Sequence, residues 1–150
     1  MATAVKKTPL KQTSRTNDPE RTMAEILLVA NKEFADKGLA GARIDEIAAA
    51  TRTSKRMIYY YFASKEGLYL AVLEAAYRRM RQIESDLHLE DLEPVQALKA
   101  LVEFTYDHHQ ANENFIRLVM NENIQRGEYL GQSKDIQQLN GSALQTIQNL

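Results

Sequence analysis

The residues between Thr51 and Lys65 combine cationic and aromatic side chains with no acidic residue among them. The cationic residues of this stretch are Arg52, Lys55, Arg56 and Lys65, and the aromatic ones are Tyr59, Tyr60, Tyr61 and Phe62. So many charges would be costly to bury, and so many aromatic rings are unusual in a solvated loop. Nucleic acid is an anion with flat bases. Its binding sites typically combine cations that neutralise phosphates with aromatic rings and hydroxyls. The stretch therefore predicts a contact with nucleic acid.

Other kinds of site find little support in the residue types of the chain. Its 150 residues include no cysteine, which excludes a disulfide framework and a thiolate metal site. A glycine-rich phosphate loop, a His-Glu-x-x-His motif and a converging catalytic set are all missing, so we predict no enzyme and no cofactor. His108 and His109 are adjacent, and adjacent helical residues point about 100° apart, so no metal site is predicted. No apolar run approaches the roughly 20 residues that span a bilayer, and the polar N-terminus does not resemble a signal peptide, so we expect a cytoplasmic protein without a membrane partner.

Charge is divided unevenly along the chain, whose overall net charge is −1. Residues 1–65 carry 12 Lys and Arg against 7 Asp and Glu, whereas residues 66–150 carry 7 against 13. A basic N-terminal half beside an acidic C-terminal half favours nucleic-acid contact by the first half only. Residues 1–17 are basic and poor in apolar side chains, and we expect a disordered arm there. That arm either adds phosphate contacts or is simply a solvated terminus.

Two short helices are expected to position the cationic and aromatic stretch. Ile44 to Thr51 has apolar residues at i, i+3 and i+4, and a second helix begins after Ser54, a typical N-cap. Helices joined by three residues in this way describe a helix-turn-helix. In the second helix, Ser54 is expected to act as the cap, and Ile58, Tyr61 and Phe62 are expected to face inward as support.

The remaining side chains of the second helix are expected to face DNA. The predicted contacts are Lys55, Arg56, Met57, Tyr59, Tyr60 and Lys65. Arg56 lies near the N-terminus of the helix, where it could fork onto a guanine, and Met57 could touch a thymine methyl or lie against neighbouring side chains. The hydroxyls of Tyr59 and Tyr60 suit phosphates. Lys65 begins the next helix, where the dipole favours an anion.

Helices are also expected in the rest of the chain, so the predicted fold class is all-α. The first should run from Asp18 to Gly38, with an apolar face formed by Leu27, Ala30 and Phe34. A long helix should follow the cap Ser64 and end near Leu87, another should begin at Pro94, and a further one should end at Gly127. The last 23 residues suggest one short helix and the start of another, on either side of Asn140-Gly141. The apolar face of the helix that begins at Pro94 is expected to contain Val95, Leu98, Leu101, Val102 and Tyr106.

The run FADKGLAGARIDEIAAATRTSKRMIYYYFASKEGLYLAVLE resembles the DNA-binding domain of the tetracycline-repressor (TetR) family of bacterial transcription regulators. The resemblance extends from about Arg21 to Glu74. Its matching positions are Phe34-Ala35, Gly38, Ile47-Ala48, Ser54, Tyr59, Tyr61-Phe62 and Ser64-Lys65-Glu66. The family implies a homodimer on a palindromic double-stranded DNA operator and a ligand-responsive repressor. It also implies a helix-turn-helix head over residues 18–65, with the motif at 43–62, and a helical regulatory domain from residue 66 to 150.

Three departures from the family pattern bear on DNA recognition. Arg52 stands where the family usually has Gly, and a left-handed conformation there would cost roughly 1–2 kcal/mol. Arg56 replaces a residue that is often small, which suggests altered base readout. Ala42-Arg43 stands where many members begin the second helix with Thr or Ser, so Arg43 becomes a further candidate DNA contact. Arg43 and Arg52 could instead be ordinary solvated charges.

The C-terminal half resembles the regulatory domain of the family only loosely. Members usually continue further, with helices that pair in the dimer, so we expect either a truncated sequence or a different dimer. The resemblance implies an unknown small-molecule effector held between helices. Its candidate cavity residues are Tyr77, Tyr106, His109, Phe115 and Met120, each of which could equally be plain core. An alternative for this half is a helical protein-interaction module without an effector.

Overall fold

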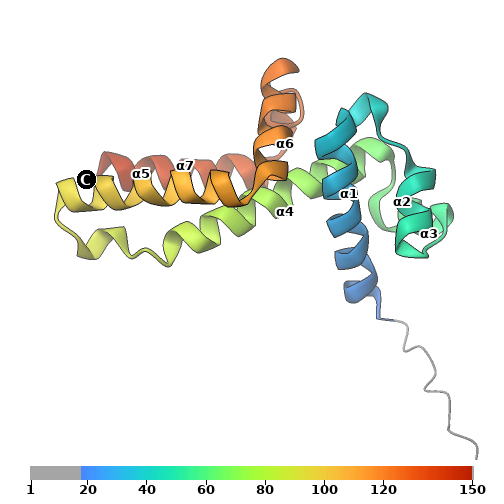
Figure 1. Cartoon of the computed structure of the whole chain (residues 1–150), viewed down its shortest axis with the longest axis horizontal. Helices are drawn as coiled ribbons and strands as arrows, with labels where there is room; N and C mark the ends of the chain where they lie inside the picture. The colour runs from blue at the N-terminus through green and yellow to red at the C-terminus, as the bar shows by residue number, and fades with distance from the viewer. Residues whose placement is uncertain (1–17, 150) are drawn as a thin grey trace, which may run out of the picture.

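The computed structural model describes residues 18–149, in which helices are the only regular secondary structure (Figure 1). The elements are α1 (Pro19–Gly41), α2 (Ile44–Thr51), α3 (Lys55–Phe62), α4 (Lys65–Ser85), η1 (Leu89–Asp91), α5 (Pro94–Ala111), α6 (Glu113–Ile124), η2 (Leu130–Gln132) and α7 (Lys134–Gln148). The expected all-α class is therefore confirmed. The predicted basic arm, residues 1–17, lies outside the described residues. Between residues 18 and 149 no helix is long and apolar enough to cross a membrane.

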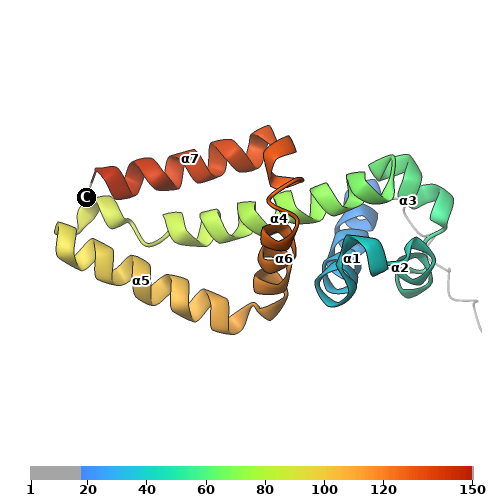
Figure 2. The same ribbon diagram turned by 90° about the horizontal axis from the view of Figure 1, so that it is seen from above.

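The helices form two groups that α4 connects (Figures 1 and 2). We call α1, α2, α3 and the first turns of α4 the head, and the rest of α4 with α5, α6 and α7 the body. Figure 2 shows α5 and α7 flanking the second half of α4. Helix α6 stands across this bundle and contacts α1, so the head and the body meet through α4 and α6.

The head is built on a continuous apolar core. The buried residues that join its helices are Ile26, Ala30, Phe34, Ile44, Ile47, Ala48, Ile58, Leu68 and Val72. The ring of Phe34 meets the ring of Tyr69 edge-on at a centroid distance of 5.1 Å. On α1 the buried stripe contains Ile26 rather than the expected Leu27, which is only half-buried. The stripe follows an i, i+4, i+8 row, and this row turns Leu27 toward the side of the helix.

Local signals define the helix ends of the head. The side chains of Asp18, Ser54 and Ser64 accept N–H groups at 3.2, 3.1 and 2.9 Å, so all three expected N-caps are confirmed. Gly38 has φ 68° and ψ 176° and interrupts α1, so only one irregular turn continues to Gly41. This is the predicted stop, because glycine enters the positive-φ region without the steric cost of a side chain.

Two expectations for the body are wrong. Asn140-Gly141 does not separate two helices, because α7 runs through both residues. A glycine inside a helix costs only about 1 kcal/mol, and α7 gains burial of Ile136 and Ala143 together with the cap that Ser133 supplies to Ile136 N–H.

The second wrong expectation is the inward face of α5. Val95, Leu98, Val102 and Tyr106 are 81, 52, 60 and 64% exposed, and only Leu101 of the expected face is half-buried. Helix α5 instead buries Ala97 and His108, which lie on the opposite side of the helix. The periodicity of a sequence identifies an apolar stripe on a helix, but it does not show which element packs against that stripe. None of the described residues covers the apolar stripe of α5.

Candidate nucleic-acid interface

The turn between α2 and α3 is held by backbone hydrogen bonds around Arg52. Arg52 has φ 54° and ψ 27°, so it adopts the left-handed conformation considered from the sequence. Its N–H points at the carbonyls of Ala48 and Ala49, and Thr51 Oγ1 donates to the Ile47 carbonyl at 2.8 Å. The strain of roughly 1–2 kcal/mol is offset by these contacts, and the turn places α3 across the end of α2.

Helix α2 is anchored to α1 through Glu33. The Glu33 carboxylate accepts the Arg43 N–H at 3.2 Å and lies 2.9 Å from Lys37 Nζ. Lys37 also donates to Glu46 on α2. Hydrogen bonds to Glu46 and then to Glu33 raise the pKa of Lys37, so this link between the helices stays charged at neutral pH.

One face of α3 attaches the helix to the head. Ile58 is fully buried, whereas Tyr61 and Phe62 are only half-buried and pack against the edge of the core. The prediction that Tyr61 and Phe62 belong to the core is thus too strong. Helix α3 has 8 residues at the periphery of the head, where a single residue reaches the centre.

The opposite face of α3 presents most of the expected DNA-contacting side chains. Lys55 and Arg56 are exposed, and Tyr59 and Tyr60 are 38 and 78% exposed. Met57 was expected to face outward but is half-buried. It lines a shallow groove with Pro19 of α1, which makes lateral packing as good an account of Met57 as a base contact.

The cations of this face form weak ion pairs or none among the described residues. Lys55 Nζ lies 3.1 Å from Asp45, and an Arg43 guanidinium nitrogen lies 3.9 Å from the same carboxylate. All three side chains are at least half exposed, so these pairs contribute about 0–1 kcal/mol and phosphates could replace them. Arg56 has no ion-pair partner within residues 18–149 and is the most available cation of α3.

Lys65 has a contact that the sequence did not suggest. It is half-buried at the start of α4, and its Nζ donates to the Ala40 carbonyl at 3.3 Å. The ammonium has further N–H groups beyond this one, so a phosphate contact remains compatible with the bond. Lys65 therefore joins the end of α1 to the start of α4, and no local sequence pattern signals such a contact.

Three of the five candidate cavity residues come together, and the other two do not join them. Tyr77 and Phe115 are buried and pack edge-on at 5.4 Å, and the His109 ring stacks on Phe115 at 6.0 Å. Tyr106 and Met120 are 64 and 56% exposed. Phe115 lines a cavity between α1, α4 and α6 that none of the other four reaches.

Potential metal ligands are few in the part of the chain that the structure describes. His88, Glu90 and Asp91 bring one ligand atom each within 4.8 Å of one another, but all three are exposed. Exposed acidic groups commonly cluster in this way without an ion, so we assign no metal to them.

The chain matches known proteins in both its head and its body. Residues 26–72 match the sequence profile of bacterial regulatory proteins of the tetR family, and residues 94–150 match that of a tetracyclin repressor-like C-terminal domain. The HTH-type transcriptional repressor NicS of Pseudomonas putida is 37% identical over 130 residues, which cover 87% of this chain and 61% of that protein. The HTH-type transcriptional regulator RutR of Escherichia coli K12 is 37% identical over 101 residues, 60% of this chain and 44% of RutR. The chain thus spans less than two thirds of both relatives.

A solved structure shares the arrangement of the helices. The hemolysin II transcriptional regulator HlyIIR superposes with a TM-score of 0.67 at 26% identity. The superposition covers 88% of this chain and 72% of that one. The resemblance therefore includes the body as well as the head.

Proposed function

Because this chain belongs to the tetracycline-repressor (TetR) family of transcription regulators, we propose that the protein binds a specific DNA operator and acts as a ligand-responsive repressor. The observation that carries the proposal is the outer face of α3. There Lys55 and Arg56 are exposed at the N-terminal end of a helix that buried Ile58 anchors. A helix of this size fits the major groove, and its N-terminal side chains reach base edges.

Arg56 and Lys65 are proposed to contact different parts of DNA. We expect Arg56→Ala to weaken operator binding by about 1–3 kcal/mol while leaving binding to random DNA nearly unchanged, because a bidentate arginine reads a base edge.

We expect Lys65→Ala to weaken binding to both DNAs alike and to lower the slope of the salt dependence by roughly one, because a phosphate contact carries no sequence information. Fluorescence anisotropy with operator and random duplexes at two salt concentrations measures both effects.

A distant arginine provides the control for these variants. Arg78 is exposed on the body and pairs with Asp135 at 3.6 Å, so Arg78→Ala should leave both affinities unchanged. If Arg56→Ala weakened binding to operator and to random DNA equally, Arg56 would be a phosphate contact instead of a base contact. Because Lys65 Nζ also bonds the Ala40 carbonyl, the thermal stability of Lys65→Ala is measured alongside.

A homodimer is proposed as the DNA-binding form. A single α3 of 8 residues contacts few base pairs, and a two-fold protein pairs naturally with a near-palindromic site. Footprinting is expected to protect two related half-sites separated by about one helical turn. Protection of one asymmetric half-site by a monomer would contradict the dimer.

A second candidate function applies to the body alone. The exposed stripe on α5, formed by Val95, Leu98, Val102 and Tyr106, is an apolar surface of the kind found at protein-protein contacts. This stripe favours a helical interaction module that responds to a protein instead of a small molecule. Two results together would support this alternative. Operator binding would be unaffected by small molecules, and a protein partner would release the protein from DNA.

A further inference from the structure

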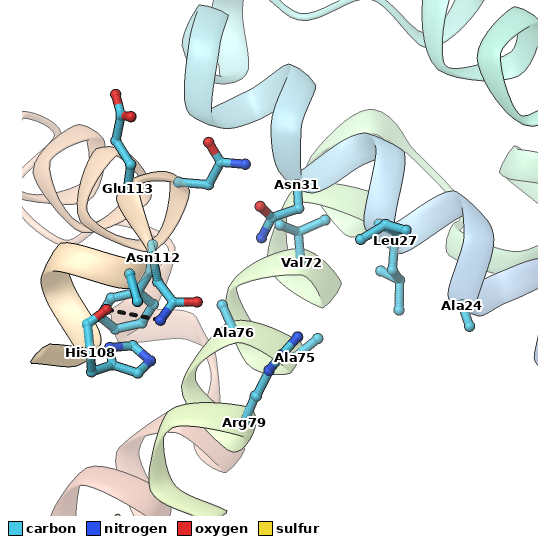
Figure 3. A pocket seen from close by; sticks show the side chains of 14 residues that line it. Ala24, Leu27, Asn31, Val72, Ala75, Ala76, Arg79, His108, Asn112 and Glu113 are labelled. Carbon is cyan, nitrogen blue, oxygen red and sulfur yellow. Dashed lines mark hydrogen bonds between the residues drawn. The ribbon is translucent and has the colours of Figure 1, made fainter. Parts of the chain in front are cut away.

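A cavity of about 510 Å³ lies where the head meets the body. Its walls come from α1, from the middle of α4, and from the end of α5 with the start of α6 (Figure 3). This cavity is not the site predicted from the sequence, because Phe115 is the only one of the five candidate cavity residues that lines it.

The floor of the cavity is apolar. Leu27 and Leu28 of α1, Val72 and Ala76 of α4, and Phe115 of α6 contribute to it. Leu28 is 74% exposed and Leu27 half-buried, so the α1 side of the floor can exchange water for an apolar ligand. An apolar surface with a few convergent polar groups is the usual composition of a small-molecule site.

Arg79 supplies an uncompensated positive charge at the edge of this floor. Its neighbours Arg78 and Arg81 form ion pairs with Asp135 and Glu84, whereas Arg79 forms none within residues 18–149. Glu113 also lines the cavity, but its carboxylate is paired with Arg117 at 2.8 Å, so it does not neutralise Arg79.

His108 contributes a buried polar group without a partner. The side chain is 8% exposed, and Nδ1 has no hydrogen-bond partner among the described residues. Burial, followed by the charges of His109 and Arg79, lowers the pKa of His108, so the imidazole is neutral at pH 7. Figure 3 shows His108, Arg79 and Asn31 around the same opening, each from a different helix. Buried polar groups are normally satisfied, but His108 Nδ1 is inaccessible to solvent, so His108 adds polarity to this wall without offering Nδ1 directly to a ligand.

We propose that this cavity binds a small organic carboxylate whose apolar body lies on the floor and whose anionic group pairs with Arg79. Arginine forms bidentate, charge-assisted bonds to carboxylates, and the amide of Asn31 offers an additional donor. Arg79 is the charge on these walls that no carboxylate pairs with among the described residues, which disfavours a cation, and the apolar floor disfavours a bare inorganic anion.

The location gives the ligand a way to act on the head, a step that depends on the proposed DNA-binding function. The ligand would contact α1 on one side and the α5–α6 turn on the other. Further along α1, Asn121 Nδ2 donates to the Phe34 carbonyl at 3.3 Å and holds α1 against α6. A ligand that binds more tightly at one distance between α1 and the α5–α6 turn favours the head orientation that has this distance. Binding of the ligand would therefore change how often the head adopts the orientation that binds DNA.

Calorimetry with 2-naphthoate and its uncharged analogue 2-naphthamide tests the site on the whole chain. We expect saturable binding of 2-naphthoate and at least about tenfold weaker binding of the amide. Arg79→Met is expected to weaken 2-naphthoate binding by about tenfold or more, and the matched control Arg78→Met should leave it unchanged. Ala76→Leu, which adds volume to the floor, is expected to abolish binding of both compounds.

The outcomes separate the site from the proposed function. No saturable binding, equal binding of acid and amide, or equal effects of the two arginine variants would overturn the carboxylate site. Undiminished binding to a folded Ala76→Leu protein would place the ligand elsewhere and overturn it too. Operator affinity of the ligand-free protein is measured separately, so a failure of DNA binding would count against the proposed function alone.

Discussion

Replacing Gly67 by alanine is expected to destabilise the protein by about 3 kcal/mol, the upper end of overpacking costs. A Cβ at this position would lie 2.1 Å from the carbonyl oxygen of Phe62 and 3.3 Å from its carbonyl carbon. Both atoms are backbone, so the clash cannot be relieved by a side-chain rotation. The end of α3 would have to move away from α4, and operator affinity should fall together with the free energy of unfolding. Urea denaturation and anisotropy on the same preparation measure the two effects.

A second glycine on a helix controls for the effect of adding a methyl group. Gly141 lies within α7, and a Cβ there meets nothing within 4 Å. We expect Gly141→Ala to stabilise the protein by about 0.5–1 kcal/mol, because alanine is the better helix former. A Gly67→Ala protein as stable as the Gly141→Ala protein would contradict the close contact at the α3–α4 junction.

Loss of the buried carboxylate of Glu122 is expected to cost roughly 3–5 kcal/mol, because each buried donor left without an acceptor costs about 1–3 kcal/mol. Glu122 is 0% exposed. Its Oε1 accepts the Tyr69 hydroxyl at 2.8 Å, and its Oε2 accepts the N–H groups of Tyr129 and Leu130 at 3.1 Å each. Burial and then the bond to Glu122 raise the pKa of Tyr69, so the hydroxyl remains a donor at neutral pH. Glu122→Ala would leave these donors buried without an acceptor.

The conservative variant distinguishes hydrogen bonding from packing at this site. In Glu122→Gln the amide oxygen can accept both backbone N–H groups, and the amide nitrogen can donate to the Tyr69 oxygen. We expect a loss of about 1 kcal/mol, because the amide keeps a hydrogen bond to each of the three groups. Chemical denaturation of both variants gives the comparison. Equal losses for alanine and glutamine would contradict this account, because they would mean that the hydrogen bonds of the amide do not replace those of the carboxylate.

The head was largely predictable from the sequence because its signals are local. Ser54 and Ser64 cap helices by bonding an N–H three residues later, and Gly38 stops α1 through its own backbone freedom. Capping needs no knowledge of the tertiary structure. The outward orientation of Lys55 and Arg56 follows equally well from their spacing relative to Ile58.

The body was less predictable because its important contacts join distant residues. Glu122 and Tyr69 are separated by 53 positions, and Asn121 and Phe34 by 87. No periodicity links such pairs. The α5 stripe was misassigned for the same reason, since the sequence shows an amphipathic helix but not which side meets α4. The cavity residues Asn31, Arg79 and His108 come from three helices and form no motif.

The continuity of α4 has a mechanical consequence. Its 21 residues form one helix, which at 1.5 Å per residue is a lever about 32 Å long. A tilt of about 5° about the body end would displace the other end by about 3 Å. That displacement is close to the rise of about 3.4 Å between successive base pairs. Such a tilt would therefore carry α3 out of register with the edges of the bases that it is proposed to read.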